Sequence, residues 1–220
     1  MIKVAPSMLA ADYLNLGSEI DKVIASGADV LHYDVMDGTF VQNISFGQEI
    51  LKKVSKKPID VDVHLMIQNP EKQIKSFAEA GAKYITVHQE AAGFGLKDTL
   101  KKIREYGCLA GVSVKPYTMV SSLKEVIHDV DMILIMTVEP GKGGQKLIPF
   151  TVDKVKEVYR MCREEGVSPI IEVDGGVGME TAHLVTEAGA DMLVAGSAFF
   201  KAEDPKAFVE ALKKMPTPAE

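Results

Sequence analysis

Cysteine is scarce in this chain and tryptophan is absent. The 220 residues include two cysteines, Cys108 and Cys162. They stand at no spacing typical of a zinc or redox motif. This scarcity argues against a disulfide-stabilised secreted domain and against a cysteine-ligated metal. The sequence therefore indicates a reduced protein of the cytoplasm.

Long apolar runs are missing as well. No stretch approaches the ~20 consecutive apolar residues that a membrane-spanning helix requires. The first residues, Met1-Ile2-Lys3, lead directly into a strand-like run and do not resemble a signal peptide. We therefore expect neither secretion nor membrane association.

Positive charge is in deficit. The chain has 25 Lys and Arg against 31 Asp and Glu, a net charge of −6 at pH 7. Such a balance gives no support to nucleic-acid binding, and an anionic substrate would need a local cationic or backbone N–H site. The G-x-G-x-x-G loop of dinucleotide-binding folds is also absent after every strand candidate.

Strand-like and helix-like segments alternate along the chain, which predicts a parallel sheet connected by helices. The strand candidates are Ile2–Leu9, Val30–Met36, Ile59–Ile67, Tyr84–Glu90, Leu109–Lys115, Met132–Val138, Pro169–Asp174 and Met192–Ala198. The helix candidates are Tyr13–Ser26, Gly47–Val54, a segment beginning at Pro70-Glu71, Leu96–Tyr106, Ser121–Val130, Phe150–Glu165, Glu180–Ala188 and Pro205–Met215.

A glycine recurs where a helix gives way to a strand. Gly27, Gly81 and Gly189 occupy equivalent junctions, and their spacings are 54 and 108 residues. Glycine ends a helix by adopting the left-handed conformation. Eight strand–helix units with this regularity predict one (β/α)₈ (TIM) barrel domain over residues 1–220, with a loose tail at 216–220. A doubly wound open sheet is the alternative.

Polar residues gather where three of the predicted strands end. His32 and Asp34 share one face of their strand because side chains alternate. His64 ends the next strand, and Asp174 ends the seventh. Active sites of barrels lie at these carboxyl ends. Two histidines and two carboxylates suit one divalent transition metal, with Zn²⁺ preferred and Fe²⁺, Mn²⁺ or Co²⁺ as alternatives.

The two carboxylates of this group suit a proton-transfer reaction. Asp34 and Asp174 are expected on roughly opposite sides of the ring of strands. One can remove a proton from one face of a carbon while the other delivers a proton to the opposite face. A metal between them can hold the oxygens of an enediolate if that carbon is next to a carbonyl.

Glycine-rich loops follow the last three strands and predict an oxyanion site. Glycines let backbone N–H groups approach a phosphate closely, and barrels commonly bind phosphate after strands seven and eight. The candidate residues are Gly141, Lys142, Gly143, Gly144, Gly175, Gly176, Gly196 and Ser197.

Other residues near the strand ends have two open interpretations. Met36, Met66 and Met136 either fill the core or form an apolar cap that excludes water from a reactive enediolate. His88 and Glu90, at the end of the fourth strand, either line the pocket or form a pair outside it. His128 and His183 fall in helical stretches and are expected at the surface.

Taken together, these segments resemble the ribulose-phosphate 3-epimerase family almost from end to end. The matching motifs are Ala5-Pro6-Ser7, His32-Tyr33-Asp34-Val35-Met36-Asp37-Gly38, Asn43-Ile44-Ser45-Phe46-Gly47, Asp62-Val63-His64-Leu65-Met66, Met136-Thr137-Val138-Glu139-Pro140-Gly141, Glu172-Val173-Asp174-Gly175-Gly176 and Gly196-Ser197-Ala198.

The resemblance implies a ribulose-phosphate-binding TIM barrel that interconverts D-ribulose 5-phosphate and D-xylulose 5-phosphate, a reaction of the pentose phosphate pathway. It implies that Asp34 and Asp174 are the acid–base pair and, with His32 and His64, the metal ligands. By the same resemblance Ser7 and His64 contact the sugar. The glycine loops would hold the phosphate of a phosphorylated ketose, and we expect a homo-oligomer.

Two positions depart from the family pattern. Gln42 stands where the family usually has proline, which loosens that loop without removing a reactive group. Lys142 stands in the sequence Gly141-Lys142-Gly143-Gly144-Gln145, where the family usually has phenylalanine. A cation beside the predicted phosphate site bears directly on substrate preference.

Two other functions remain open on the sequence. A 3-epimerase acting on D-allulose 6-phosphate would use a similar fold and site. A barrel that binds sugar phosphates without catalysis is the other possibility, and the presence of both Asp34 and Asp174 argues against it.

Overall fold

The computed structural model describes residues 1–218 of the chain. Residues 216–218 have no regular secondary structure, and the remainder of the predicted tail, residues 219–220, lies outside the described part. Within residues 1–218, none of the helices combines the length and apolar character that crossing a bilayer requires.

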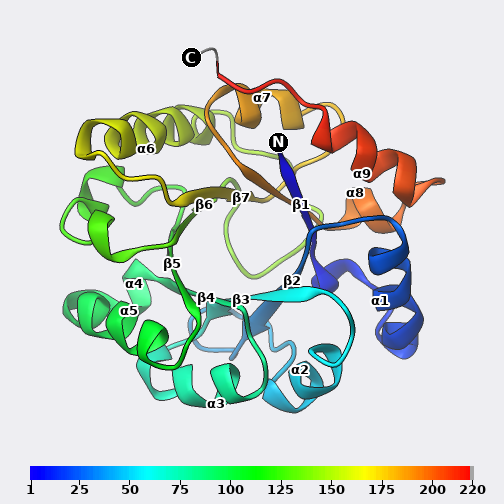
Figure 1. Cartoon of the computed structure of the whole chain (residues 1–220), viewed down its shortest axis with the longest axis horizontal. Coiled ribbons are helices and arrows are strands. Elements are labelled where there is room, and N and C mark those ends of the chain that lie inside the picture. Colours follow the sequence, from blue (N-terminus) through cyan, green and yellow to red (C-terminus); the bar gives the residue numbers. More distant parts are fainter. Residues whose placement is uncertain (219–220) are drawn as a thin grey trace.

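Parallel strands form the centre of the molecule, in the order β1-β8-β7-β6-β5-β4-β3-β2 (Figure 1). Their bounds are β1 (Lys3–Pro6), β2 (Val30–Met36), β3 (Asp60–Met66), β4 (Tyr84–His88), β5 (Leu109–Val114), β6 (Met132–Met136), β7 (Ile170–Asp174) and β8 (Met192–Ala195). The first strand pairs with the last, so the sheet curves into a barrel, and the open-sheet alternative is wrong. The prediction of an eight-stranded α/β barrel is confirmed.

The barrel closes between β1 and β2 through a small number of contacts. A single parallel bridge joins Ser7 to His32. Below it, the N–H of Asp29 donates to the carbonyl of Val4 at 3.0 Å, and Oδ2 of Asp29 accepts from the N–H of Val4 at 2.9 Å. We call this junction the β1–β2 seam.

Helices surround the barrel on its outside (Figure 1). The longer ones are α1 (Leu16–Ala25), α2 (Gln48–Val54), α3 (Ile74–Glu79), α5 (Leu96–Glu105), α6 (Thr151–Glu165), α7 (Ala182–Glu187) and α9 (Pro205–Lys213), and single turns form α4 (Gln89–Ala92) and α8 (Ser197–Phe200). Short 3₁₀ turns are η1 (Met8–Ala10), η2 (Tyr13–Asn15), η3 (Pro70–Lys72), η4 (Gly93–Gly95), η5 (Val120–Leu123) and η6 (Ile127–Asp129).

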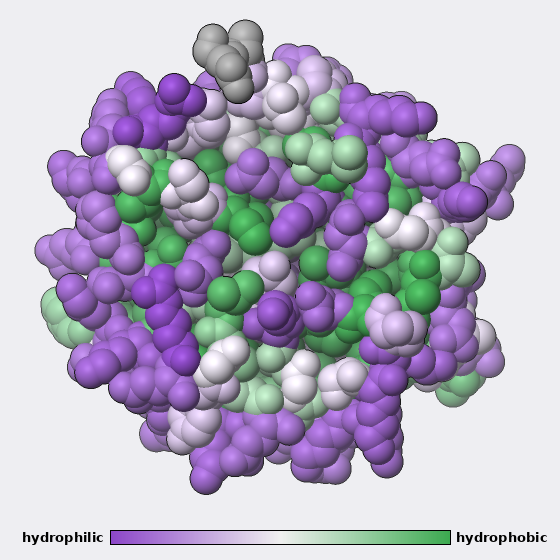
Figure 2. All heavy atoms as spheres, viewed as in Figure 1, coloured by the Kyte–Doolittle hydropathy of each residue, from purple (hydrophilic) through white to green (hydrophobic). Residues whose placement is uncertain are grey.

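Alternation along each strand separates the core from the site. On β2, Leu31, Tyr33 and Val35 are buried in the main apolar core, whereas His32 and Asp34 belong to the opposite face, inside the barrel. Hydrophilic side chains make up most of the outer ring of the molecule (Figure 2). Inside the barrel, His32 and Asp34 are buried despite their polarity.

Several predicted boundaries are wrong by a few residues, and one element is wrong in kind. The helix predicted over Ser121–Val130 is instead the two 3₁₀ turns η5 and η6. Val120, Leu123 and Val126 are buried there, and a spacing of three residues suits a 3₁₀ turn as well as a helix. The strands predicted to reach Leu9, Glu90 and Ala198 end earlier, because η1, α4 and α8 begin there.

The glycine junctions behave as predicted. Gly27 has a φ of 77° and Gly189 a φ of 116°. At Gly189 an added Cβ would also lie 2.6 Å from the ring of Tyr159, so both the conformation and the space require glycine.

Candidate active site and metal centre

Four side chains from three strands converge at the upper end of the barrel interior. His32 and Asp34 come from β2, His64 from β3 and Asp174 from the end of β7, and one ligand atom from each lies within 4.8 Å of the others. Nδ1 of His64 is 3.0 Å from Oδ1 of Asp34, and Nε2 of His32 is 3.3 Å from the same oxygen. This cluster, which we call the HDHD cluster, could hold a metal ion.

His32 is oriented for such a role by a second carboxylate behind it. Its Nδ1 lies 2.6 Å from Oδ2 of Asp62, while its Nε2 is buried without a hydrogen-bond partner. A histidine that donates one ring N–H to a carboxylate and presents the other nitrogen is the usual arrangement at a metal centre. Burial alone would lower the pKa of His32, but Asp34 and Asp62 raise it well above its ordinary value. The site therefore favours positive charge.

A second acidic pair lies deeper in the barrel and was not singled out from the sequence. Asp62 and Glu172 are fully buried, and they form with His32 another group of close ligand atoms. Both side-chain oxygens of Glu172 lack a hydrogen-bond partner. Burial, followed by the charge of Asp62, raises the pKa of Glu172 to about 8. Their signal was position, since each lies two residues before a cluster residue on the same strand face.

A chain of contacts leads from the HDHD cluster toward the rim. Nε2 of His64 lies 2.9 Å from Nε2 of His88, and Nδ1 of His88 lies 3.2 Å from Oε2 of Glu90. Burial lowers the pKa of His88 to about 4, so its ring is neutral at pH 7. Burial would raise the pKa of Glu90, but His88, Thr118 and a backbone N–H lower it to about 2. Neither His88 nor Glu90 is among the residues that line the pocket above the HDHD cluster, and the two form a contact pair beside it.

The two candidate acid–base residues have opposite electrostatic surroundings. Burial opposes ionisation of Asp34, yet the charges and hydrogen bonds of His32 and His64 outweigh it and hold the pKa of Asp34 far below its usual range. Burial, and then the charge of Asp34, raises the pKa of Asp174 to about 6. Two carboxyl groups with pKa values driven apart suit separate base and acid roles.

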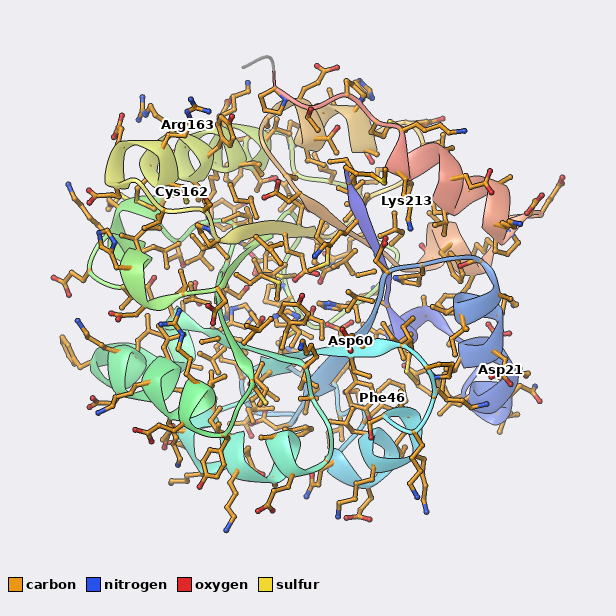
Figure 3. The ribbon with its side chains drawn as sticks, viewed as in Figure 1. Asp21, Phe46, Asp60, Cys162, Arg163 and Lys213 are labelled. Carbon is orange, nitrogen blue, oxygen red and sulfur yellow. The ribbon has the colours of Figure 1, made fainter. Side chains whose placement is uncertain are left out.

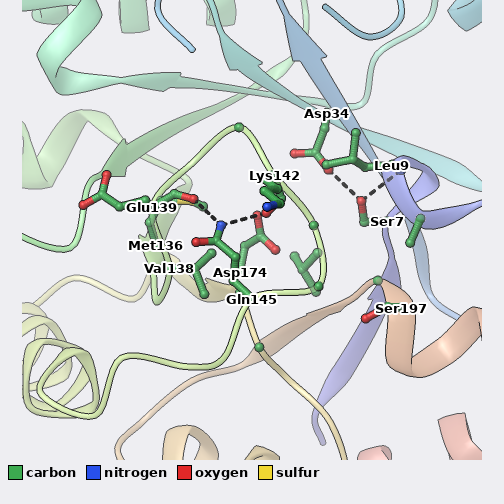
Figure 4. Close-up of a pocket in the computed structure, with 18 of the residues that line it drawn as sticks. Ser7, Leu9, Asp34, Met136, Val138, Glu139, Lys142, Gln145, Asp174 and Ser197 are labelled. Atoms are coloured by element: carbon green, nitrogen blue, oxygen red, sulfur yellow. Dashed lines mark hydrogen bonds between the residues drawn. The ribbon is translucent and has the colours of Figure 1, made fainter. Parts of the chain in front are cut away.

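Ser7 attaches the end of β1 to this pair. Its hydroxyl donates to Oδ2 of Asp34 at 2.6 Å and accepts from the N–H of Leu9 at 3.2 Å (Figure 4). The hydrogen bond from Ser7 fixes the orientation of the Asp34 carboxylate at the mouth of the barrel.

The pocket above the cluster contains the predicted glycine loops. In Figure 4 the loop that carries Lys142 and Gln145 curves around Asp174, and Asp34 and Ser7 lie to one side of it. The amide of Gln145 donates to the carbonyls of Glu139 and Lys142, at 2.7 Å each, which holds the loop in a tight curve. The predicted residues in the lining are Ser7, Asp34, Met36, Met66, Met136, Gly141, Lys142, Gly143, Gly144, Asp174, Gly175, Gly176, Gly196 and Ser197.

Two details distinguish the roles of these lining residues. Gly176 has a φ of 66°, and an added Cβ would lie 2.3 Å from the backbone nitrogen of Leu147, so glycine is required where two loops meet. The three predicted methionines are at most 3% exposed and lie in the lining, where they contribute to its apolar surface together with residues such as Leu9 and Val138. His32 and His64 lie below the lining, with no exposed surface.

Comparisons with solved structures identify the same architecture. 3-Hexulose-6-phosphate synthase from Salmonella typhimurium aligns with a TM-score of 0.73 at 19% identity and covers 97% of both chains. 3-Keto-L-gulonate-6-phosphate decarboxylase from Vibrio cholerae aligns with a TM-score of 0.72 at 14% identity, over 97% of this chain and 96% of that one. At these identities the likeness concerns the fold alone.

Sequence comparisons are more specific. Ribulose-phosphate 3-epimerase of Bacillus subtilis is 49% identical over 215 residues, which cover 97% of this chain and 99% of the relative. The enzyme of the same name from Escherichia coli K12 is 43% identical and covers 96% and 94%. The model of the ribulose-phosphate 3 epimerase family matches residues 3–200. The chain therefore belongs to the ribulose-phosphate 3-epimerase family and is an isomerase of the epimerase class.

Proposed function

We propose that this enzyme interconverts D-ribulose 5-phosphate and D-xylulose 5-phosphate by proton transfer at C3, in a metal-dependent reaction. The observation that carries the proposal is the placement of Asp34 and Asp174 in one cluster with His32 and His64. Relatives named ribulose-phosphate 3-epimerase at 43–49% identity support the substrate assignment.

The HDHD cluster fits a divalent transition metal. It supplies two imidazole nitrogens and two carboxylates, Nε2 of His32 is buried without a partner, and Asp62 holds the ring in a ligating orientation. Zn²⁺ suits this donor set, and Fe²⁺, Mn²⁺ and Co²⁺ are the alternatives. The ion would supply Lewis-acid stabilisation of the negative charge that develops on the substrate oxygens.

The two aspartates divide the proton transfer between them. Asp34, held ionised by His32 and His64, is the base that accepts the C3 proton on its side of the sugar. Asp174, whose pKa is raised to about 6, is the more basic of the two carboxylates and is suited to deliver a proton to the opposite side of C3. Removal on one face and return on the other inverts the configuration, and the roles are exchanged in the reverse direction.

The rest of the pocket positions the substrate and keeps it dry. Backbone N–H groups of the glycine loops are suited to donate to the phosphate of the substrate. Gly176 lies where two of these loops come closest to each other. Lys142 adds a positive charge on the same side. Met36, Met66 and Met136 present apolar surface to the planar intermediate and exclude water from it.

A coupled epimerisation assay tests the proposal. The enzyme as purified, the chelator-treated enzyme and the same sample reloaded with Zn²⁺ or Mn²⁺ are compared on D-ribulose 5-phosphate and on D-allulose 6-phosphate. We expect kcat/KM to be higher on the pentose phosphate, lost after chelation and restored on reloading. A higher kcat/KM on the hexulose phosphate, or full activity without metal, would overturn the assignment.

A further inference from the structure

The side-chain contacts that run from Glu90 through His88 to His64 form a hydrogen-bond chain, and its donors and acceptors have a defined direction. We propose that Glu90 is a positioning residue that fixes the proton of each histidine on the side facing away from the HDHD cluster, so that Nδ1 of His64 offers its electron pair to a metal ion. This inference rests on the proposed function, because it assumes that His64 is a ligand.

The direction follows from counting protons along the chain. Each of the two contacts, His64 Nε2 to His88 Nε2 at 2.9 Å and His88 Nδ1 to Glu90 Oε2 at 3.2 Å, needs one proton. Nδ1 of His64 lies 3.0 Å from Oδ1 of Asp34, and a bound metal ion would take the place of the proton in that contact. A ligating His64 therefore has no proton on Nδ1, carries one on Nε2 and donates it to His88. Nε2 of His88 then accepts, and its own proton is on Nδ1, pointing at Glu90. Two neutral rings hold the two protons required.

Glu90 can only accept at the outer end of the chain. Its Oε1 already accepts from the N–H of Lys115 at 2.8 Å and from the hydroxyl of Thr118. These two donors come from the segment after β5 and hold the carboxylate in place. Oε2 remains directed at His88, and an ionised carboxylate has no proton to donate.

The surroundings of His88 leave its ring no other partner. The ring has no exposed surface and is covered by the ring of Phe40, with 4.8 Å between centroids. Nζ of Lys115 in turn lies over the Phe40 ring, 4.1 Å from its centre. Water therefore does not compete for the His88 nitrogens, and the choice between its two tautomers is made by Glu90 and His64.

One isosteric substitution should reverse the direction of donation along this hydrogen-bond chain. In Glu90→Gln the amide oxygen keeps the two donors, Lys115 N–H and Thr118 hydroxyl, and the amide nitrogen faces Nδ1 of His88. That nitrogen donates, so His88 carries its proton on Nε2 and His64 must carry its proton on Nδ1, where a metal ion would bind. We expect the Kd for Zn²⁺, measured by competition with a chromophoric chelator, to rise about ten- to a hundredfold.

Thr118→Val is the matched control. It removes a hydrogen bond to the same carboxylate but leaves its charge and its contact with His88, so its Kd for Zn²⁺ should stay within about twofold of wild type. In His88→Gln the amide oxygen can accept from Nε2 of His64 without help from Glu90. Adding Glu90→Gln to that variant should therefore change the Kd for Zn²⁺ little. If the Kd instead rose by the same factor as in the Glu90→Gln single variant, the proposed role of Glu90 would be wrong.

Ring-nitrogen NMR gives a readout that is independent of turnover. With five histidines in the chain, long-range ¹H–¹⁵N spectra can be assigned by substitution. We expect the proton of His88 on Nδ1 in the Zn²⁺-loaded enzyme and on Nε2 in Glu90→Gln. If wild type binds Zn²⁺ but Glu90→Gln binds it equally well with an unchanged tautomer, this inference is wrong. If wild type binds no metal, the proposed function is wrong instead.

Discussion

The hydroxyl of Ser7 lies 2.6 Å from Oδ2 of Asp34, and this hydrogen bond crosses the β1–β2 seam. The contact joins the first strand to the proposed base at the junction where the two segments share one bridge and one further backbone hydrogen bond, from Asp29 to Val4. It therefore acts on both the closure of the barrel and the charge state of Asp34, since a donor to a carboxylate favours its ionised form.

Ser7→Ala should lower kcat/KM about ten- to a hundredfold, because a hydrogen bond to a charged group contributes roughly 1.5–3 kcal/mol. Steady-state assays measure this. Ser45→Ala is the comparison, since Ser45 donates at 2.6 Å to the backbone carbonyl of Asp34 and not to its carboxylate. An equal loss of activity in both variants would mean that Ser7 acts through the backbone alone.

Asp174→Asn should reduce epimerisation by at least the ~10²–10⁴-fold typical of a lost general acid or base. Asp34 remains able to exchange the C3 proton on its own side. In D₂O we therefore expect deuterium to enter one epimer without conversion to the other, and Asp34→Asn should show the opposite preference. NMR of the recovered sugar phosphates measures this.

Metal content must be compared in both variants, because the same carboxylates are proposed ligands. A metal-loaded Asp174→Asn enzyme that epimerises within about tenfold of wild type would contradict the two-base scheme.

Asp62→Asn tests the carboxylate behind His32. Losing a partner that orients a ligating histidine typically weakens metal binding about ten- to a hundredfold. Asp60→Asn is the matched control, because Asp60 lies on the same strand but is exposed at its start, as Figure 3 shows. Chelator competition should give a higher Kd for Zn²⁺ in Asp62→Asn only. Equal Kd values in the two variants would mean that Asp62 does not orient His32 for metal binding.

Metal affinity should depend on pH through Asp174. Its pKa is raised to about 6 in the cation-free cluster, so below this pH a proton occupies the carboxylate that a cation needs. Affinity for Zn²⁺ is therefore expected to increase as the pH rises through about 6. It should go on rising above that pH, because His32, whose pKa is raised, must also lose a proton before it can bind the ion. Titration calorimetry from about pH 5 to about pH 8 checks the sign, and Asp174→Asn should remove the part of the rise near pH 6.

Lys142→Phe restores the residue typical of the family and should mainly raise KM, with kcat little changed. Lys142 is exposed in the loop above the pocket, where a charge-assisted contact with phosphate can form. The difference from wild type should shrink at high salt. Lys142→Gln separates charge from shape, and an unchanged KM at low salt in both variants would leave Lys142 without a role in binding.

The sequence was sufficient for the architecture and for the residues that meet at the strand ends. His32, Asp34, His64 and Asp174 could be placed because the carboxyl ends of parallel strands open on one face of a barrel. The helix predicted at Ser121–Val130 failed because its apolar spacing suits more than one kind of turn.

Asp62, Glu172 and His88 show where prediction from sequence stops. Alternation relative to His64 and Asp174 would have been enough to put Asp62 and Glu172 on the inward face, although neither residue was predicted there. The partner of an inward side chain depends on strand stagger and tilt, which no local sequence pattern records. Asp62 lies opposite His32 in the strand register, whereas His88 lies two residues beyond Thr86, the register partner of His64. The contacts of Asp62 with His32 and of His88 with His64 can be identified only from the three-dimensional structure of the barrel.

The β1–β2 seam also has a consequence for the nascent chain. β1 forms its ladder with β8, so the edge of the first strand has no ladder partner until Met192–Ala195 have been synthesised. Ser7 and Asp34 emerge from the ribosome early, whereas Asp174 and Ser197 emerge late. Non-local strand pairing of this kind closes slowly. Activity should therefore not appear before β8 has been synthesised, and until then the edge of β1 is an unpaired strand edge that can associate wrongly.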